Sequence, residues 1–140
     1  MTSTARRVEL HVLHALDRLR LAWLRRRHPG LEVERGASAC FAHARIEMQS
    51  GARLRIRKGA VTDRIPGALH FSLGPGALVD VGEGAWLRTD VGAVHVIAFE
   101  GAHIEIGPKA FLNGCHLSAK RKLCVGRGAS VGVGSRVFDS

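Results

Sequence analysis

Tyrosine is absent from this chain of 140 residues, which has only two tryptophans and five phenylalanines. Three cysteines, Cys40, Cys115 and Cys124, show no C-x-x-C spacing, so neither a disulfide framework nor a zinc site is expected. No stretch approaches the ~20 apolar residues of a membrane-spanning helix, and charge interrupts the N-terminal apolar positions, so no signal peptide is expected. These absences favour a protein of the reducing cytoplasm with buried thiols.

Several functional motifs are also missing. The chain has no P-loop, no G-x-S-x-G and no H-E-x-x-H, and Val131 prevents Gly126-Arg-Gly128 from completing G-x-G-x-x-G. The scarcity of aromatic residues leaves no stacking platform for single-stranded nucleic acid, so no nucleic-acid partner is expected. His11 and His14 lie three residues apart, but no third ligand is placed beside them, and we expect no metal site.

A short phrase recurs five times along the chain. It consists of an apolar, a polar and an apolar residue, two variable positions, usually glycine, and then alanine, and it begins at Leu31, Leu54, Val79, Ile104 and Leu123. The copies follow one another at intervals of between 19 and 25 residues. Such periods are typical of solenoids, so each copy is predicted to be the first side of one coil. An ordinary β-sandwich with glycine-rich turns is the alternative.

Apolar residues in the last third of the chain recur at steps of six, from Ile106 to Leu112 and through Val125, Val131 and Val137. This step fits neither the helical period of 3.6 nor a plain amphipathic strand. It indicates short strands joined by tight turns, with one apolar residue of each unit pointing inward.

The remaining coils are less regular. Val81, Leu87 and Ala93 are the expected inward markers of the third coil, which must also contain an inserted loop. Pro66 and Pro75 interrupt the rhythm of the first two coils, and they predict loops or corners because proline cannot donate to a strand ladder.

An amphipathic helix is predicted over Thr4 to Arg27, and Pro29 follows it as a stop signal. Its proposed core-facing side carries apolar residues at steps of three and four: Val8, Val12, Leu16, Leu19 and Trp23. We therefore divide the chain into a helical unit, 1–30, and a β-helix domain, 31–140. The helix is expected to cover the open end of the first coil, where unpaired edges and core would otherwise be exposed.

The net charge is +9, and seven arginines against two acidic residues place much of the excess in residues 1–30. This balance suits anionic partners. The alternative interpretation of the helix is therefore a basic amphipathic segment, residues 4–27, that contacts an anionic membrane surface.

Residues 76–140 resemble hexapeptide-repeat acyltransferases of the sugar and capsule O-acetyltransferase kind, and residues 31–75 resemble them more loosely. The resemblance lies in Ile104-Glu-Ile-Gly107, in Phe111-Leu-Asn-Gly-Cys115 and in the later Val-Gly pairs that lead to Asp139. It implies an all-β fold, a left-handed parallel β-helix preceded here by the N-terminal α-helix. It also implies a homotrimer whose reaction takes place between neighbouring subunits.

The same resemblance implies transfer of an acetyl or other acyl group from acyl-coenzyme A, the co-substrate, to a hydroxyl of a sugar or cell-surface polysaccharide precursor. Asn113 matches a residue that faces the acceptor sugar, although Asn113-Gly114 is also ordinary turn chemistry. Asp139 matches the acidic position before the family's catalytic histidine, which would lie beyond Ser140. Within the chain, His116 is a weak candidate for that role, and His95 and His103 are weaker ones.

Two alternatives remain open at this stage. The chain is either an acyltransferase, truncated and inactive if its base lies beyond Ser140, or a non-catalytic β-solenoid that its basic helix anchors to a membrane or partner. A cytoplasmic location, peripheral to the inner face of the membrane if the helix contacts lipid, is expected in both cases. Lys120, Arg121, Lys122 and Arg127 are candidates for the coenzyme A phosphates, with a solvated corner as the alternative.

Overall fold

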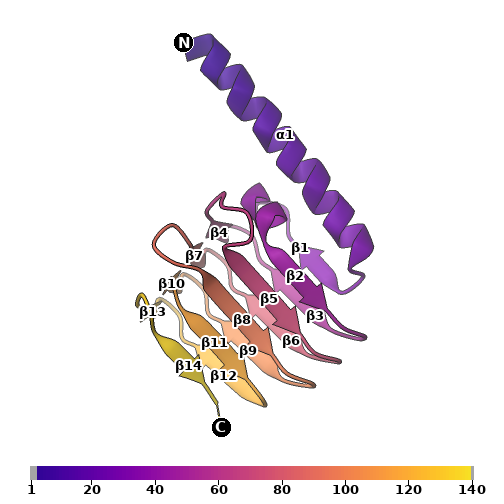
Figure 1. Ribbon diagram of the computed structural model, residues 1–140, viewed down its shortest axis with the longest axis vertical. Coiled ribbons are helices and arrows are strands. Elements are labelled where there is room, and N and C mark those ends of the chain that lie inside the picture. Colours follow the sequence, from indigo (N-terminus) through magenta and orange to yellow (C-terminus); the bar gives the residue numbers. More distant parts are fainter. Residues whose placement is uncertain (1–2, 140) are drawn as a thin grey trace.

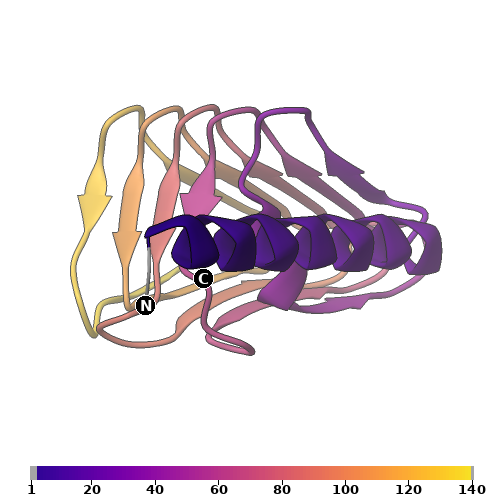
Figure 2. The same cartoon turned by 90° about the horizontal axis from the view of Figure 1, so that it is seen from above.

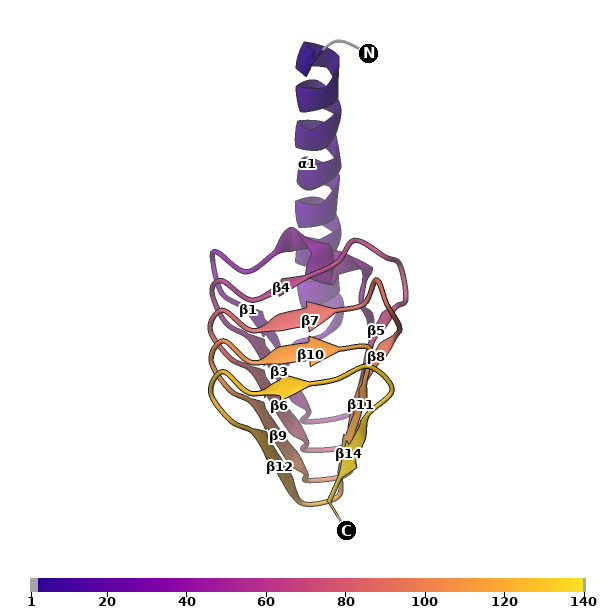
Figure 3. The same cartoon turned by 90° about the vertical axis from the view of Figure 1, so that its left-hand side faces the viewer.

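The computed structural model describes residues 3–139 as one helix followed by a β-solenoid (Figure 1). Residues 1, 2 and 140, the outer limits of the two predicted units, lie outside this description. Three parallel sheets form the sides of the solenoid, and the chain visits them in turn in each coil (Figure 3).

Sheet A contains the first strand of each coil: β1 (Leu31–Val33), β3 (Arg53–Ile56), β6 (Leu78–Val81), β9 (His103–Ile106) and β12 (Lys122–Val125). Sheet C contains the second strand: β4 (Val61–Thr62), β7 (Trp86–Arg88), β10 (Phe111–Asn113) and β13 (Ser130–Val131). Sheet B contains the last strand: β2 (Arg45–Met48), β5 (Leu69–Leu73), β8 (Val94–Ala98), β11 (His116–Ala119) and β14 (Arg136–Phe138).

The five repeated phrases are the five strands of sheet A. Their first residues are register partners from coil to coil: Leu31, Leu54, Val79, Ile104 and Leu123. The prediction of a solenoid from these phrases is therefore confirmed, and the β-sandwich alternative is wrong because every strand pair is parallel.

Two details differ from the expected pattern. The first coil has a 3₁₀ helix, η1 (Ala39–His43), where later coils have a sheet C strand. In the third coil Val81 and Leu87 are buried, as predicted, but Ala93 is exposed, and Val94 and Val96 point inward instead. The cause is the connection from β7 to β8, which is too long to keep the six-residue step.

Aliphatic residues and corner alanines fill the interior. Leu54, Ile56, Val79, Ile104 and Ile106 are at most 1% exposed, which agrees with the alternation of sheet A. The inward residues Val131 and Val137 are only half-buried, because within residues 3–139 no further coil packs on them. Of the thiols, Cys115 is buried and Cys124 is exposed, so the expectation of buried thiols is wrong for Cys124.

The helix, α1 (Ser3–Arg27), lies across the first coil and projects beyond it (Figures 1 and 2). Its contacts are with η1 and β1, so it covers the end of the solenoid as predicted. The predicted core-facing side is wrong, however: Leu16, Leu19 and Trp23 are all more than half exposed, whereas Asp17 and Leu24 are buried. Within residues 3–139, no helix has both the length and the apolar character needed to cross a membrane.

Candidate functional site

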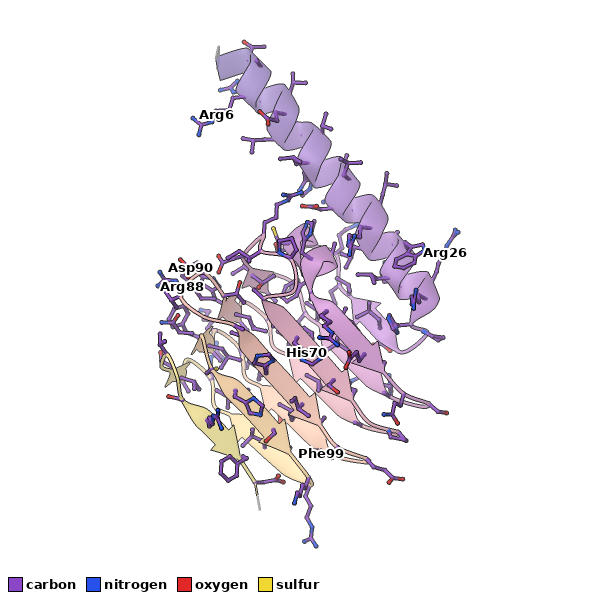
Figure 4. All side chains as sticks on the ribbon, viewed as in Figure 1. Arg6, Arg26, His70, Arg88, Asp90 and Phe99 are labelled. Carbon is purple, nitrogen blue, oxygen red and sulfur yellow. The ribbon has the colours of Figure 1, made fainter. Side chains whose placement is uncertain are left out.

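Three histidines stand in line on the outer face of sheet B, one in each of three successive coils. His70 is the register partner of His95, and His95 is the register partner of His116. Adjacent strands are ~4.8 Å apart, so the rings form a continuous row. Figure 4 shows His70 on β5, near the middle of sheet B. We call these three residues the histidine row.

A chain of polar contacts begins at one end of this row. Nε2 of His70 lies 3.2 Å from Oε2 of Glu47, and Nδ1 of His70 lies 3.3 Å from Nδ1 of His95. Arg45 donates to the other carboxylate oxygen of Glu47 over 2.7 Å. Hydrogen bonds from His70 and Arg45 hold the pKa of Glu47 below its usual value, so the carboxylate is ionised at neutral pH.

When both rings are neutral, these contacts allow only one arrangement of the ring hydrogens. An ionised carboxylate can only accept, so Nε2 of His70 donates to Glu47. In the neutral His70 ring, Nδ1 is then an acceptor, and Nδ1 of His95 must donate to it. The remaining nitrogen of a neutral His95, Nε2, therefore carries a lone pair that can accept a proton.

The surroundings of His95 keep it neutral. Burial lowers the pKa of the His95 imidazole, and the charges of His70 and His116 lower it further. The His116 ring lies on the other side of His95, with 5.8 Å between the two ring centroids. A neutral imidazole oriented through a second histidine by a carboxylate is the arrangement of a general base.

Asn113 lies at the corner where sheet C meets sheet B. It ends β10, Gly114 and Cys115 form the turn, and His116 begins β11. The amide oxygen of Asn113, Oδ1, is buried without a hydrogen-bond partner among residues 3–139. Buried acceptors are normally satisfied, but this oxygen has no exposed surface, so a sugar hydroxyl could reach it only if the turn after it opened.

Asp139 occupies a different corner, at the opposite end of the sheet B strands. Its carboxylate accepts hydrogen bonds from the backbone N–H groups of Lys120, Arg121 and Lys122 over 2.5, 2.7 and 2.8 Å. These bonds hold the pKa of Asp139 below its usual value, the one from Lys120 most strongly. In this structure the carboxylate closes the turn of the preceding coil.

The structure therefore brings together some of the predicted site residues and separates others. Asn113 and His116 flank one short turn. Asp139 lies near the other end of β11, and the length of that strand, about 13 Å, separates it from the turn. His103 is on β9 of sheet A, away from the histidine row. Neither His70 nor Glu47 was predicted from the sequence as a site residue. The one feature of the sequence that could have indicated His70 is its 25-residue separation from His95, which equals one coil.

Basic residues gather along the corner between sheets A and C. A groove of about 500 Å³ runs down this corner and is lined by Arg35, Lys58, Lys109 and Arg127, with Glu83 among them. Lys120, Arg121 and Lys122 are at the other corner of sheet A, so the basic residues proposed for phosphate contact divide between two sites.

No three histidine, cysteine or acidic side chains within residues 3–139 are grouped so that they could hold a metal ion. Comparisons with protein-family models, curated protein sequences and solved structures found no match to this chain.

Proposed function

We propose that this chain is a left-handed hexapeptide-repeat solenoid that transfers an acyl group from acyl-coenzyme A to a hydroxyl of a sugar or cell-surface polysaccharide precursor. The observation that carries the proposal is the histidine row, in which Glu47 and His70 orient a neutral His95. The in-register phrases of sheet A, through which the sequence resembles the acyltransferase family, support it.

In the proposed reaction, Nε2 of His95 removes the proton from the acceptor hydroxyl as its oxygen attacks the thioester carbonyl. The new ester C–O bond forms, the C–S bond breaks, and coenzyme A leaves as a thiolate that takes the proton from the imidazolium. Because a thioester is already activated, no covalent enzyme intermediate is needed. A general base of this kind contributes about 10²–10⁴-fold to the rate.

Two further features fit the two substrates. Once the turn at Gly114 and Cys115 opens, Oδ1 of Asn113, which is buried and unpaired, would accept a hydrogen bond from a second sugar hydroxyl. The groove that contains Arg35, Lys58, Lys109 and Arg127 presents cations from four coils, with Glu83 on the third coil, to the phosphates of coenzyme A. Because this groove is at the corner opposite sheet B, it would serve the histidine row of a neighbouring subunit rather than that of its own chain.

The trimeric state belongs to the same proposal. Val61, Trp86 and Phe111 are register partners on the outer face of sheet C, and the Trp86 and Phe111 rings are in edge contact. Val61 and Trp86 are exposed, so this apolar strip is suited to burial against a neighbouring subunit.

The test is turnover of acetyl-coenzyme A by the purified chain, with simple sugars as acceptors. His95→Gln should reduce kcat/KM about 100-fold or more, whereas His103→Gln, a half-buried histidine of sheet A, should leave it unchanged. Equal losses in both variants would contradict the role of His95. Absence of turnover with every acyl donor and sugar would overturn the proposal in favour of the non-catalytic solenoid.

A further inference from the structure

A continuous apolar face of α1 has no partner in the described part of the chain. Its five large residues are 52–68% exposed: Val8, Val12, Leu16, Leu19 and Trp23. With about 100° between successive residues, all five lie within an arc of about 80°. This face, which we call the outward face, extends along most of the helix.

The outward face lies on the opposite side of α1 from the contacts with the solenoid. Asp17 and Leu24 are buried against the first coil, and Arg20 donates to the carbonyl oxygen of Ala42 in η1. The helix therefore has two apolar sides, one of which is used by the fold. A flat surface could contact the outward face, because the coils of the solenoid extend from the other side of the helix (Figure 1).

The charges beside this face select one kind of surface. The helix has seven arginines, three of them in its last turn, against only Glu9 and Asp17. The Asp17 carboxylate already pairs with His43 and Arg64. Arg27 lies over the Trp23 ring at 5.3 Å, which places a cation and an aromatic ring together at one end of the outward face.

We propose that the outward face of α1 binds the surface of a bilayer that contains anionic lipids, with the helix in the plane of the interface. Arginine and tryptophan beside an aliphatic face are typical of helices that lie at this depth. A second copy of the chain is a poorer occupant, because it would bring the same arginine-rich flanks together. The inference does not depend on the proposed acyl transfer.

The test is binding of the 140-residue chain to vesicles of phosphatidylcholine alone and of phosphatidylcholine with phosphatidylserine. Trp86→Phe is used as the background, so that Trp23 reports contact with lipid through a blue shift of its fluorescence. Binding is expected only with phosphatidylserine, and it should weaken as salt is raised. Arg25→Gln and Arg26→Gln should each weaken it about fivefold.

A matched pair of substitutions tests whether binding depends on the outward face or only on the overall charge and apolar content of the helix. Leu19→Glu places a carboxylate on the outward face and should reduce binding about tenfold or more. Leu10→Glu makes the same change at a residue that is 59% exposed but lies on the opposite side of the helix, and it should bind like the parent. Equal effects of the two variants would overturn the proposal. The proposal would also be overturned if the parent chain did not bind vesicles but associated with itself, and if Leu19→Glu abolished that self-association.

Discussion

At the scale of single residues, Asp17 fixes α1 on the solenoid. Its carboxylate lies 2.7 Å from Nε2 of His43 and 3.1 Å from Nε of Arg64, and only 5% of the residue is exposed. Asp17→Asn removes the charge and keeps the shape, so we expect it to lower the free energy of unfolding by about 2 kcal/mol. Urea unfolding measures the loss. Glu9→Gln, an exposed carboxylate on the same helix, is the control and should have almost no effect.

The effect of Asp17 should depend on pH. Burial opposes its ionisation, but hydrogen bonds from Arg64 and His43 outweigh burial and hold its pKa below the usual value. A carboxyl group with a lowered folded-state pKa stabilises the fold above its unfolded pKa of about 3.9 and loses this effect as pH falls further. The difference between the parent and Asp17→Asn should therefore shrink below pH ~4. A constant difference down to pH ~2.5 would contradict the ionised pair.

The histidine row makes a separate prediction, which needs no substrate. Burial, and then the charges of His70 and His116, lower the pKa of His95. His70→Gln removes one of these charges, so the His95 midpoint in an NMR titration should move up towards its usual value of about 6.5. His103→Gln should leave it in place. A His95 midpoint unchanged by His70→Gln would show that the two rings are not coupled.

At the scale of elements, the spacing between coils depends on glycines that no side chain can replace. A Cβ on Gly82 would lie 2.5 Å from the carbonyl oxygen of Ile106 in the next coil, whereas a Cβ on Gly126 would meet nothing within 4 Å. Gly82→Ala should therefore cost about 1–3 kcal/mol by forcing the coils apart. Gly126→Ala should be neutral or slightly stabilising, because alanine restricts the unfolded chain. Thermal unfolding of both variants tests the contrast, and equal midpoints would contradict it.

Sheet A could be predicted from the sequence because each of its strands carries its own pattern. Leu54 and Ile56 alternate with arginines, and glycine and alanine follow at a fixed distance, so the signal is local. The inward residues of the third coil on sheet B could not be placed in this way. The connection from Thr89 to Ala93 has no fixed period, and the sequence does not determine where β8 begins after it.

The side of α1 that packs on the solenoid is a second feature that could not be predicted from the sequence. The helix has apolar residues on two sides, so periodicity alone does not distinguish them. What selects the buried side is the pairing of Asp17 with Arg64, which is 47 residues away in the chain. A helix face that carries a carboxylate normally lies toward solvent, but the partners of Asp17 make this carboxylate the anchor of the docked side.

The candidate site was only partly predictable for the same reason. Asn113 and His116 are neighbours in sequence, and the short turn between them was apparent. The histidine row depends on the lengths of the loops that set register between coils. Glu47 is 23 residues before His70, and only the stacking of β2 on β5 brings them together.

At the scale of the whole molecule, the helix closes the hydrophobic core at the first-coil end. Leu24 is 7% exposed, and Phe41 and Ala42 of η1, beneath the helix, are fully buried. The core cluster runs without a break from Leu24 to Val125. Because a solenoid transmits stability from each unit to its neighbour, the helix and the coils should unfold together.

This cooperativity can be tested with two leucines of the same helix. Leu24→Ala removes a buried side chain and should lower the stability of the whole chain by about 2–3 kcal/mol. Leu16→Ala alters a residue that is 54% exposed on the outward face and should change it by less than about 0.5 kcal/mol. The measurement is denaturant unfolding followed by circular dichroism at helical and at strand wavelengths. If Leu24→Ala shifts only the helical signal, the helix is an appendage and the solenoid is stable without its cap.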